Sequence, residues 1–226
     1  MKHHEVHQIK KLLKLTPTIS DVLLKEIYGE QRRDFSSGFF IFKSKETNSR
    51  YAFLKSIQTI EEKHKTTAVF STNGSDFLSE PFQHHNTRKS IFSFYDSPTE
   101  VISSAVRLFD EGVDSIILDF DRELFEQEVL GLRGRSFNAC DELIRLVEYY
   151  LKHNNPNQTL FLFLSGPGNP STMTADMSSN LHLIEMHAKA AIYLEKEEKS
   201  HYTFQIEYNR LQKIQNWTKI LVRGND

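Results

Sequence analysis

Short apolar runs alternate with segments of helical periodicity along most of this chain, and this alternation limits the folds open to it. Each run is too short for a buried helix, and polar or turn-forming residues separate it from the next segment. The segments between the runs are long enough for helices that cross back between parallel strands. The runs lie at residues 38–42, 67–70, 90–95, 114–119 and 159–164. We therefore expect an α/β fold with a mostly parallel, twisted sheet flanked by helices.

The last part of the chain has a different pattern. Residues 190–194 and 202–208 read as strands joined by a charged turn, and a last strand is expected at 218–222. Strands joined by a short turn pair antiparallel, so these would extend the parallel sheet at one edge, the C-terminal end of the chain.

Helices are predicted at residues 6–15, 21–28, 51–62, 98–111, 138–153 and 181–188, from apolar spacing and from capping residues. Ser20 is the expected N-cap of the second helix and Gly29 its C-terminal stop. Residues 120–137 are charged and contain two glycines, so no element is predicted there. We expect a short N-terminal helical segment at residues 1–30 and one core domain at 31–226. The apolar face of the 6–15 helix would pack either on the core or on a partner subunit.

Composition excludes several classes of function. The 226 residues carry a formal net charge of −2, which gives no global attraction to nucleic acid. Cys140 is the single cysteine, so neither an intramolecular disulfide nor a cysteine zinc cluster can form. The ten histidines lack metal-ligand spacing, and no run of about 20 apolar residues is present to span a membrane. We expect no metal, no membrane partner and a reducing compartment.

Three segments, in order along the chain, carry a family resemblance. They are GFFIFKSKETNSRYAFL at 38–54, KTTAVFSTNG at 65–74 and SIILD at 115–119. They resemble the core of the RecA-type recombinases, in which a strand enters a phosphate-binding loop of the form G-x-x-x-x-G-K-[ST] that opens a helix. The resemblance covers roughly residues 20–222 and implies a RecA-like core.

The resemblance places altered residues at the nucleotide site. Ser44 and Ser49 stand at the two glycine positions, Arg50 at the lysine and Tyr51 at the magnesium-binding hydroxyl. A Cβ obstructs the close approach that glycine permits, and arginine does not replace lysine as a point charge. Asp119 retains the acid at the end of the Walker B strand. We therefore expect a degenerate phosphate loop, no nucleotide cofactor and no ATP hydrolysis.

The neighbourhood of the catalytic glutamate is altered as well. Asn73 and Gly74 occupy it, and the nearest carboxylate, Asp76, is displaced. Two alternatives stay open for each retained charge. Arg50 would contact a phosphate or form a solvated or salt-bridged surface group. Asp119 would hold a metal or, lacking partners, play a structural part such as capping.

Two loops correspond to the DNA-facing loops of the recombinases. Arg133 and Arg135 flank a glycine in the first loop and would contact DNA phosphates or stay solvated. Residues 166–180 correspond to the second loop and have no aromatic residue, lysine or arginine. That loop lacks the stacking groups and charge that bind single-stranded DNA.

The resemblance implies a short, non-catalytic recombinase paralogue that is an accessory factor in homologous recombination and DNA repair. Its partners would be another RecA-like paralogue or a recombinase in a hetero-oligomer, and single-stranded DNA is a further candidate. It would be nuclear in a eukaryote and cytoplasmic otherwise. The alternatives are a structural RecA-like subunit of an Elongator-type tRNA-modification complex and a divergent ATPase such as a pilus motor.

Overall fold

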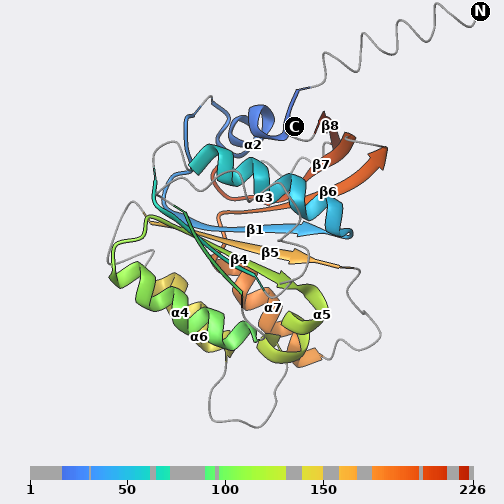
Figure 1. Cartoon of the computed structure of the whole chain (residues 1–226). Coiled ribbons are helices and arrows are strands. Elements are labelled where there is room, and N and C mark those ends of the chain that lie inside the picture. The colour runs from blue at the N-terminus through green and yellow to red at the C-terminus, as the bar shows by residue number, and fades with distance from the viewer. Residues whose placement is uncertain are drawn as a thin grey trace, which may run out of the picture.

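A computed structural model describes ten stretches of the chain, and these form one three-layered α/β unit (Figure 1). The described residues are 17–30, 32–61, 65–71, 90–94, 97–130, 139–149, 158–166, 175–198, 201–212 and 219–223. One layer of helices, α2 and α3, covers one face of the sheet, and α4, α6 and α7 cover the other (Figure 1). In the described part, no helix is long and apolar enough to cross a membrane.

Within these stretches, eight strands form one sheet in the order β3-β2-β4-β5-β1-β6-β7-β8. β1 to β6 run parallel to one another, whereas β7 is antiparallel to β6 and β8 is antiparallel to β7. The strands are β1 (Gly38–Ser44), β2 (Thr67–Ser71), β3 (Ser90–Phe94), β4 (Ser115–Asp121), β5 (Thr159–Ser165), β6 (Ala190–Glu198), β7 (His201–Asn209) and β8 (Lys219–Arg223). The mostly parallel sheet with antiparallel strands at the C-terminal edge is confirmed.

The helices are α2 (Ile19–Tyr28), α3 (Thr47–Glu61), α4 (Pro98–Asp110), α5 (Arg122–Phe125), the π-helix η2 (Glu126–Leu130), α6 (Ala139–Tyr149) and α7 (Ala175–His187). The predicted cap of α2 was wrong: Thr18, not Ser20, is the N-cap, and it forms a reciprocal capping box with Asp21. Gly29 ends α2 in the left-handed conformation, as predicted.

Three other differences have physical reasons. α3 begins at Thr47 rather than at residue 51, because its first turn buries the polar residues Ser49 and Arg50 and so lacks an apolar signal. α7 begins at Ala175 rather than at 181, because its apolar residues are spread around the helix. Residues 122–130 are helical although no element was expected, and Asp121 caps that segment by accepting from the Leu124 amide.

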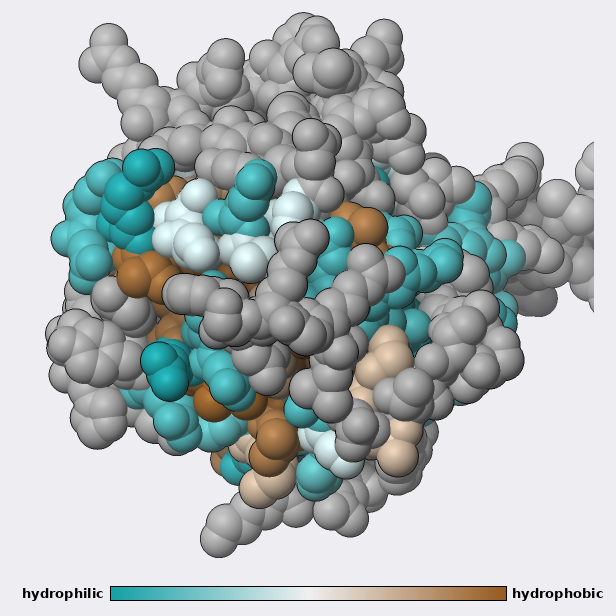
Figure 2. Space-filling view, turned by 90° about the horizontal axis from the view of Figure 1, so that it is seen from below, coloured by the Kyte–Doolittle hydropathy of each residue, from teal (hydrophilic) through white to brown (hydrophobic). Residues whose placement is uncertain are grey.

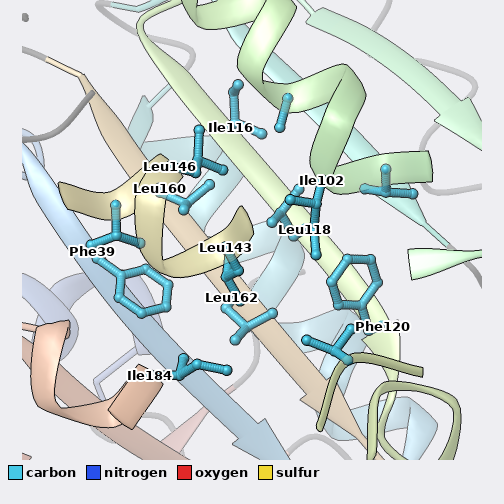
Figure 3. Packing of buried hydrophobic residues seen from close by; sticks show 14 of the residues in the cluster. Phe39, Ile102, Ile116, Leu118, Phe120, Leu143, Leu146, Leu160, Leu162 and Ile184 are labelled. Carbon is cyan, nitrogen blue, oxygen red and sulfur yellow. The ribbon is translucent and has the colours of Figure 1, made fainter. Parts of the chain in front are cut away.

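Two apolar cores lie on opposite faces of the sheet. Alternate residues of β1 show this, because Phe39 and Ile41 join the core under α4, α6 and α7, whereas Phe40 and Phe42 join the core under α2 and α3. Figure 3 shows the first core, where Leu143 of α6 and Ile184 of α7 approach the strand residues Leu160 and Leu162. Both faces of the central strands are therefore buried, which is why they read as continuous apolar runs.

Candidate functional site

The loop from β1 into α3 lies at the carboxyl ends of the parallel strands. Ser44 is the last residue of β1, and its hydroxyl donates to the backbone carbonyl of Glu46 at 3.2 Å. The Arg50 amide donates to the same carbonyl, also at 3.2 Å, which is an i→i−4 bond of a normal helical turn. The Ser44 carbonyl accepts from the Gly166 amide just beyond β5 at 3.0 Å. The loop is thereby tied to its neighbouring strand.

The Arg50 side chain points into the protein rather than into solvent. Arg50 is 2 % exposed. Its Nη1 donates to Ser165 Oγ at 3.2 Å, and its Nε lies 3.5 Å from Asp119 Oδ1. The guanidinium also lies over the Tyr51 ring, 4.8 Å from the ring centroid. One of the two predictions for Arg50 was a solvated or salt-bridged surface group. Arg50 does form a salt bridge, but it is buried and not at the surface.

Asp119 has defined partners, which corrects the expectation that it has none. It lies at 0 % exposure on β4 and faces Arg50 on one oxygen. Its other oxygen, Oδ2, accepts from Ser71 Oγ at 2.7 Å, and Ser71 is the register partner of Asp119 on β2. The Arg50–Asp119 pair therefore links the first turn of α3 to the ends of β2, β4 and β5. We call Arg50, Asp119, Ser71 and Ser165 the buried arginine cluster.

Comparison with known proteins gives a clear result for the fold. A scan against models of protein families finds no match, and a search of the curated proteins also finds none. Among solved structures, the chain is similar to one described as "Crystal structure of the RadB recombinase", with a TM-score of 0.57 and 14 % sequence identity. The similarity covers 88 % of this chain and 92 % of the other.

The fold is RecA-like. The predicted resemblance to the RecA-type recombinase superfamily is thus confirmed for the architecture. In this RecA-like chain, the buried arginine cluster occupies the strand-end position where the sequence resemblance places the phosphate loop and the Walker B acid. The residues present do not fit a magnesium nucleotide. Arg50 and Ser71 already contact the Asp119 carboxylate, and the Arg50 amide is bonded within its helix.

Ser49 and Arg50 place further buried polar atoms in the altered loop. Ser49 is fully buried, and its hydroxyl makes no hydrogen bond with the part of the chain that the structure describes. Arg50 Nη2 is also buried without an acceptor there. The Ser49 side chain would stand where a glycine lets phosphate approach the backbone. No group of three or more His, Cys, Asp or Glu residues that could hold a metal occurs among the described residues.

Sequence reasoning missed Ser71 and the structural part played by Ser165. Both are the last residues of buried strands, and both follow unbroken apolar runs. A polar residue at the carboxyl end of a parallel strand was the available signal, because such ends meet at one edge of the sheet. The partnership itself required the strand order, which places β4 between β2 and β5.

Several predicted positions lie outside the described residues. Arg133 and Arg135 fall in the stretch 131–138, and most of the second predicted DNA-facing loop falls in 167–174. Asn73, Gly74 and Asp76 fall in the stretch 72–89. Residues 1–16 of the predicted N-terminal segment also lie outside the described residues. Predictions on these residues stay predictions.

Proposed function

We propose that this chain is a non-catalytic RecA-like paralogue, an accessory factor in homologous recombination and DNA repair that acts in a complex with another RecA-like protein. The buried Arg50–Asp119 pair carries the proposal. It puts an internal cation where a nucleotide-binding relative would keep an open phosphate cradle, a mobile lysine and a carboxylate available to magnesium.

Energetics support a site that stays closed. Opening it would separate a buried arginine from a buried aspartate, and breaking such a pair costs about 3–5 kcal/mol. Tyr51 adds a ring under the guanidinium, which contributes roughly 0.5–2 kcal/mol more to holding Arg50 in place. A nucleotide would have to offset both before it gained any contact of its own.

A RecA-like sheet without a working nucleotide site favours a part in assembly over a part in catalysis. Its fold neighbour is a recombinase, which favours recombination as the setting. We further propose that Arg133 and Arg135 supply any direct contact with single-stranded DNA, through phosphates. The second candidate setting, an Elongator-type complex, predicts the same closed site and differs in its partners.

Partner identification tests the proposal. The chain is tagged at its own locus, the native complex is purified, and its components are identified by mass spectrometry. We expect a recombinase or RecA-like paralogue in stoichiometric amount, and sensitivity to DNA-damaging agents when the gene is deleted. Recovery of Elongator-type subunits, or a deletion strain with normal damage resistance, would overturn the proposal.

A matched set of variants separates DNA contact from complex formation. The deletion strain is complemented with wild type, with Arg133→Ala/Arg135→Ala, and with the control Arg107→Ala, which removes an exposed arginine on α4. We expect the double variant to keep its partner but to lose damage resistance and salt-sensitive DNA binding by the complex. Unchanged DNA binding would remove these arginines from the proposal.

A further inference from the structure

The outer face of α7 is unusual for a helix that faces solvent. Its exposed positions carry no charged side chain among those described, although solvated helix faces are normally charged. Leu183 is 45 % exposed and Met186 is 53 % exposed, while Ile184 of the same helix packs into the core. The other exposed residues described on α7 are Ala175, Ser178, Ser179 and His182. The helical layer that contains α7 faces the viewer in Figure 2, where brown apolar surface lies among teal hydrophilic residues.

This apolar surface continues onto the end of β7. Arg210 donates from Nη1 to the backbone carbonyl of Met186, and its amide donates to the Lys189 carbonyl at 2.9 Å. The next residue, Leu211, is 39 % exposed. Leu183, Met186 and Arg210 therefore lie next to one another, and Leu211 follows Arg210 along the chain; we call these four residues the α7 corner.

Arg210 of the α7 corner and the neighbouring Lys189 form no ion pair with the residues that the structure describes. Across the described residues, no carboxylate lies within 4 Å of Arg210 or of Lys189. Among the described residues, the Lys189 ammonium donates to the backbone carbonyl of Ser37 and to no other group. Burial lowers the pKa of Lys189, and the positive charge of Arg32 lowers it further. Arg32 forms a long ion pair with Glu30, in which Nη1 lies 3.8 Å from Oε1. A carboxylate brought close to Lys189 would offset the repulsion from Arg32, and one brought close to Arg210 would pair with an exposed guanidinium.

We propose that the α7 corner docks a short segment of a partner protein that presents a large apolar side chain next to aspartate or glutamate. The apolar group would cover Leu183 and Met186, and the carboxylates would face Arg210 and Lys189. Burying such side chains supplies affinity, while complementary charge at the rim supplies orientation and association rate.

The surface favours a protein segment over nucleic acid. Proteins that bind single-stranded nucleic acid present exposed aromatic faces along a continuous basic groove. Here the aromatic residue at the corner, Tyr208, is capped by Arg210 at 5.3 Å from its ring centroid, and the exposed side chains are aliphatic. Leucine and methionine offer nothing to a phosphate, whereas they are ordinary contacts for a buried leucine or phenylalanine.

The α7 corner and the buried arginine cluster lie at opposite ends of the parallel strands. Lys189 bonds to Phe39 at the start of β1, whereas Ser44 at the end of β1 belongs to the altered loop. Five residue steps along a strand separate these ends, which is about 17 Å. The docking proposal therefore does not rest on whether a nucleotide binds, nor on which pathway the chain serves.

Photo-cross-linking in living cells tests the docking proposal on the full chain. p-Benzoylphenylalanine replaces Met186 or, separately, Leu183, and the matched control carries it at Thr59, an exposed position on α3 in the opposite helical layer. Each probe is also combined with Arg210→Glu, and with Arg107→Glu as a charge control on α4. Thermal melting of every variant shows whether it folds.

We expect both corner probes to cross-link one protein segment that carries Asp or Glu within about four residues of an apolar residue. Arg210→Glu should reduce the yield by roughly tenfold, because a charge at a docking rim is reversed, and Arg107→Glu should leave it unchanged. Four results would overturn the proposal: no protein cross-link above the Thr59 control, cross-links to nucleic acid, cross-links to a second copy of this chain, or a segment without carboxylates whose yield ignores Arg210→Glu.

Discussion

Replacing Arg50 with methionine should destabilise the protein strongly, because it leaves Asp119 as a buried carboxylate without its cation. The Nε–Oδ1 distance of 3.5 Å corresponds to about 5 kcal/mol of Coulomb attraction at an effective dielectric constant of 20. Ser71 would still donate to Asp119, so part of the solvation survives. We therefore expect Arg50→Met to lower the free energy of unfolding by about 3–5 kcal/mol. In a domain of this size that corresponds to a fall in Tm of roughly 6–20 °C.

Urea denaturation followed by circular dichroism measures this loss, and a double-mutant cycle assigns it to the pair. Asp119→Asn keeps an acceptor for Ser71 but removes the charge, so alone it strands the buried arginine. The double variant Arg50→Met/Asp119→Asn should recover about 1–3 kcal/mol relative to the sum of the single losses. Arg107→Met, which breaks an exposed pair with Glu111, should cost less than about 1 kcal/mol. Losses that simply add, or an Arg50→Met loss as small as that control, would refute the reasoning.

Three further outcomes follow from other buried groups. Lys65→Met should lower the free energy of unfolding, measured by urea denaturation, by about 3–5 kcal/mol, because it removes the cation that lies 3.0 Å from the buried Glu61 carboxylate. Gly38→Ala should destabilise more than Gly112→Ala. Both glycines have positive φ, but a Cβ at Gly38 would lie 2.5 Å from Lys189 Cε and would displace that side chain from the Ser37 carbonyl, while Gly112 faces open space. Burial raises the pKa of Tyr28 to about 12 from 10.0, so its contribution is complete below pH 10 and is lost as pH rises toward 12. Tyr28→Phe should accordingly flatten the fall of stability between those pH values, and an unchanged slope would contradict the assignment.

Much of the fold could be predicted from local sequence, because each central strand is buried on both faces and α2, α4 and α6 each carry an apolar stripe, which α7 lacks. The strands at 38–42 and 159–164 lengthened by two residues and one residue in the structure, and the antiparallel edge lies where the charged turn suggested. The prediction failed where polar residues are buried. Ser49 and Arg50 hid the first turn of α3, and the helices at 122–130 had too many charges to show an apolar stripe.

The site could be predicted only in part. The sequence located the altered loop and Asp119, but it did not predict that Arg50 turns inward to meet Asp119, 69 positions further along the chain. That contact depends on the order of β2, β4, β5 and β1 in the sheet, which no local pattern encodes. The burial of Arg50 was not predicted either, because an arginine is expected at the surface unless a buried partner is known.

Equilibrium binding of ATP to the purified chain tests the central claim most directly. Titration calorimetry with magnesium ATP, together with a phosphate-release assay, is run on wild type, on Arg50→Ala and, as a charge control, on Arg107→Ala. The closed arginine cluster predicts neither binding at millimolar nucleotide nor turnover by the wild type or Arg107→Ala, and we expect none from Arg50→Ala, which still lacks the loop glycines and lysine. Saturable binding or turnover by the wild type that Arg50→Ala abolishes and Arg107→Ala keeps would contradict the account.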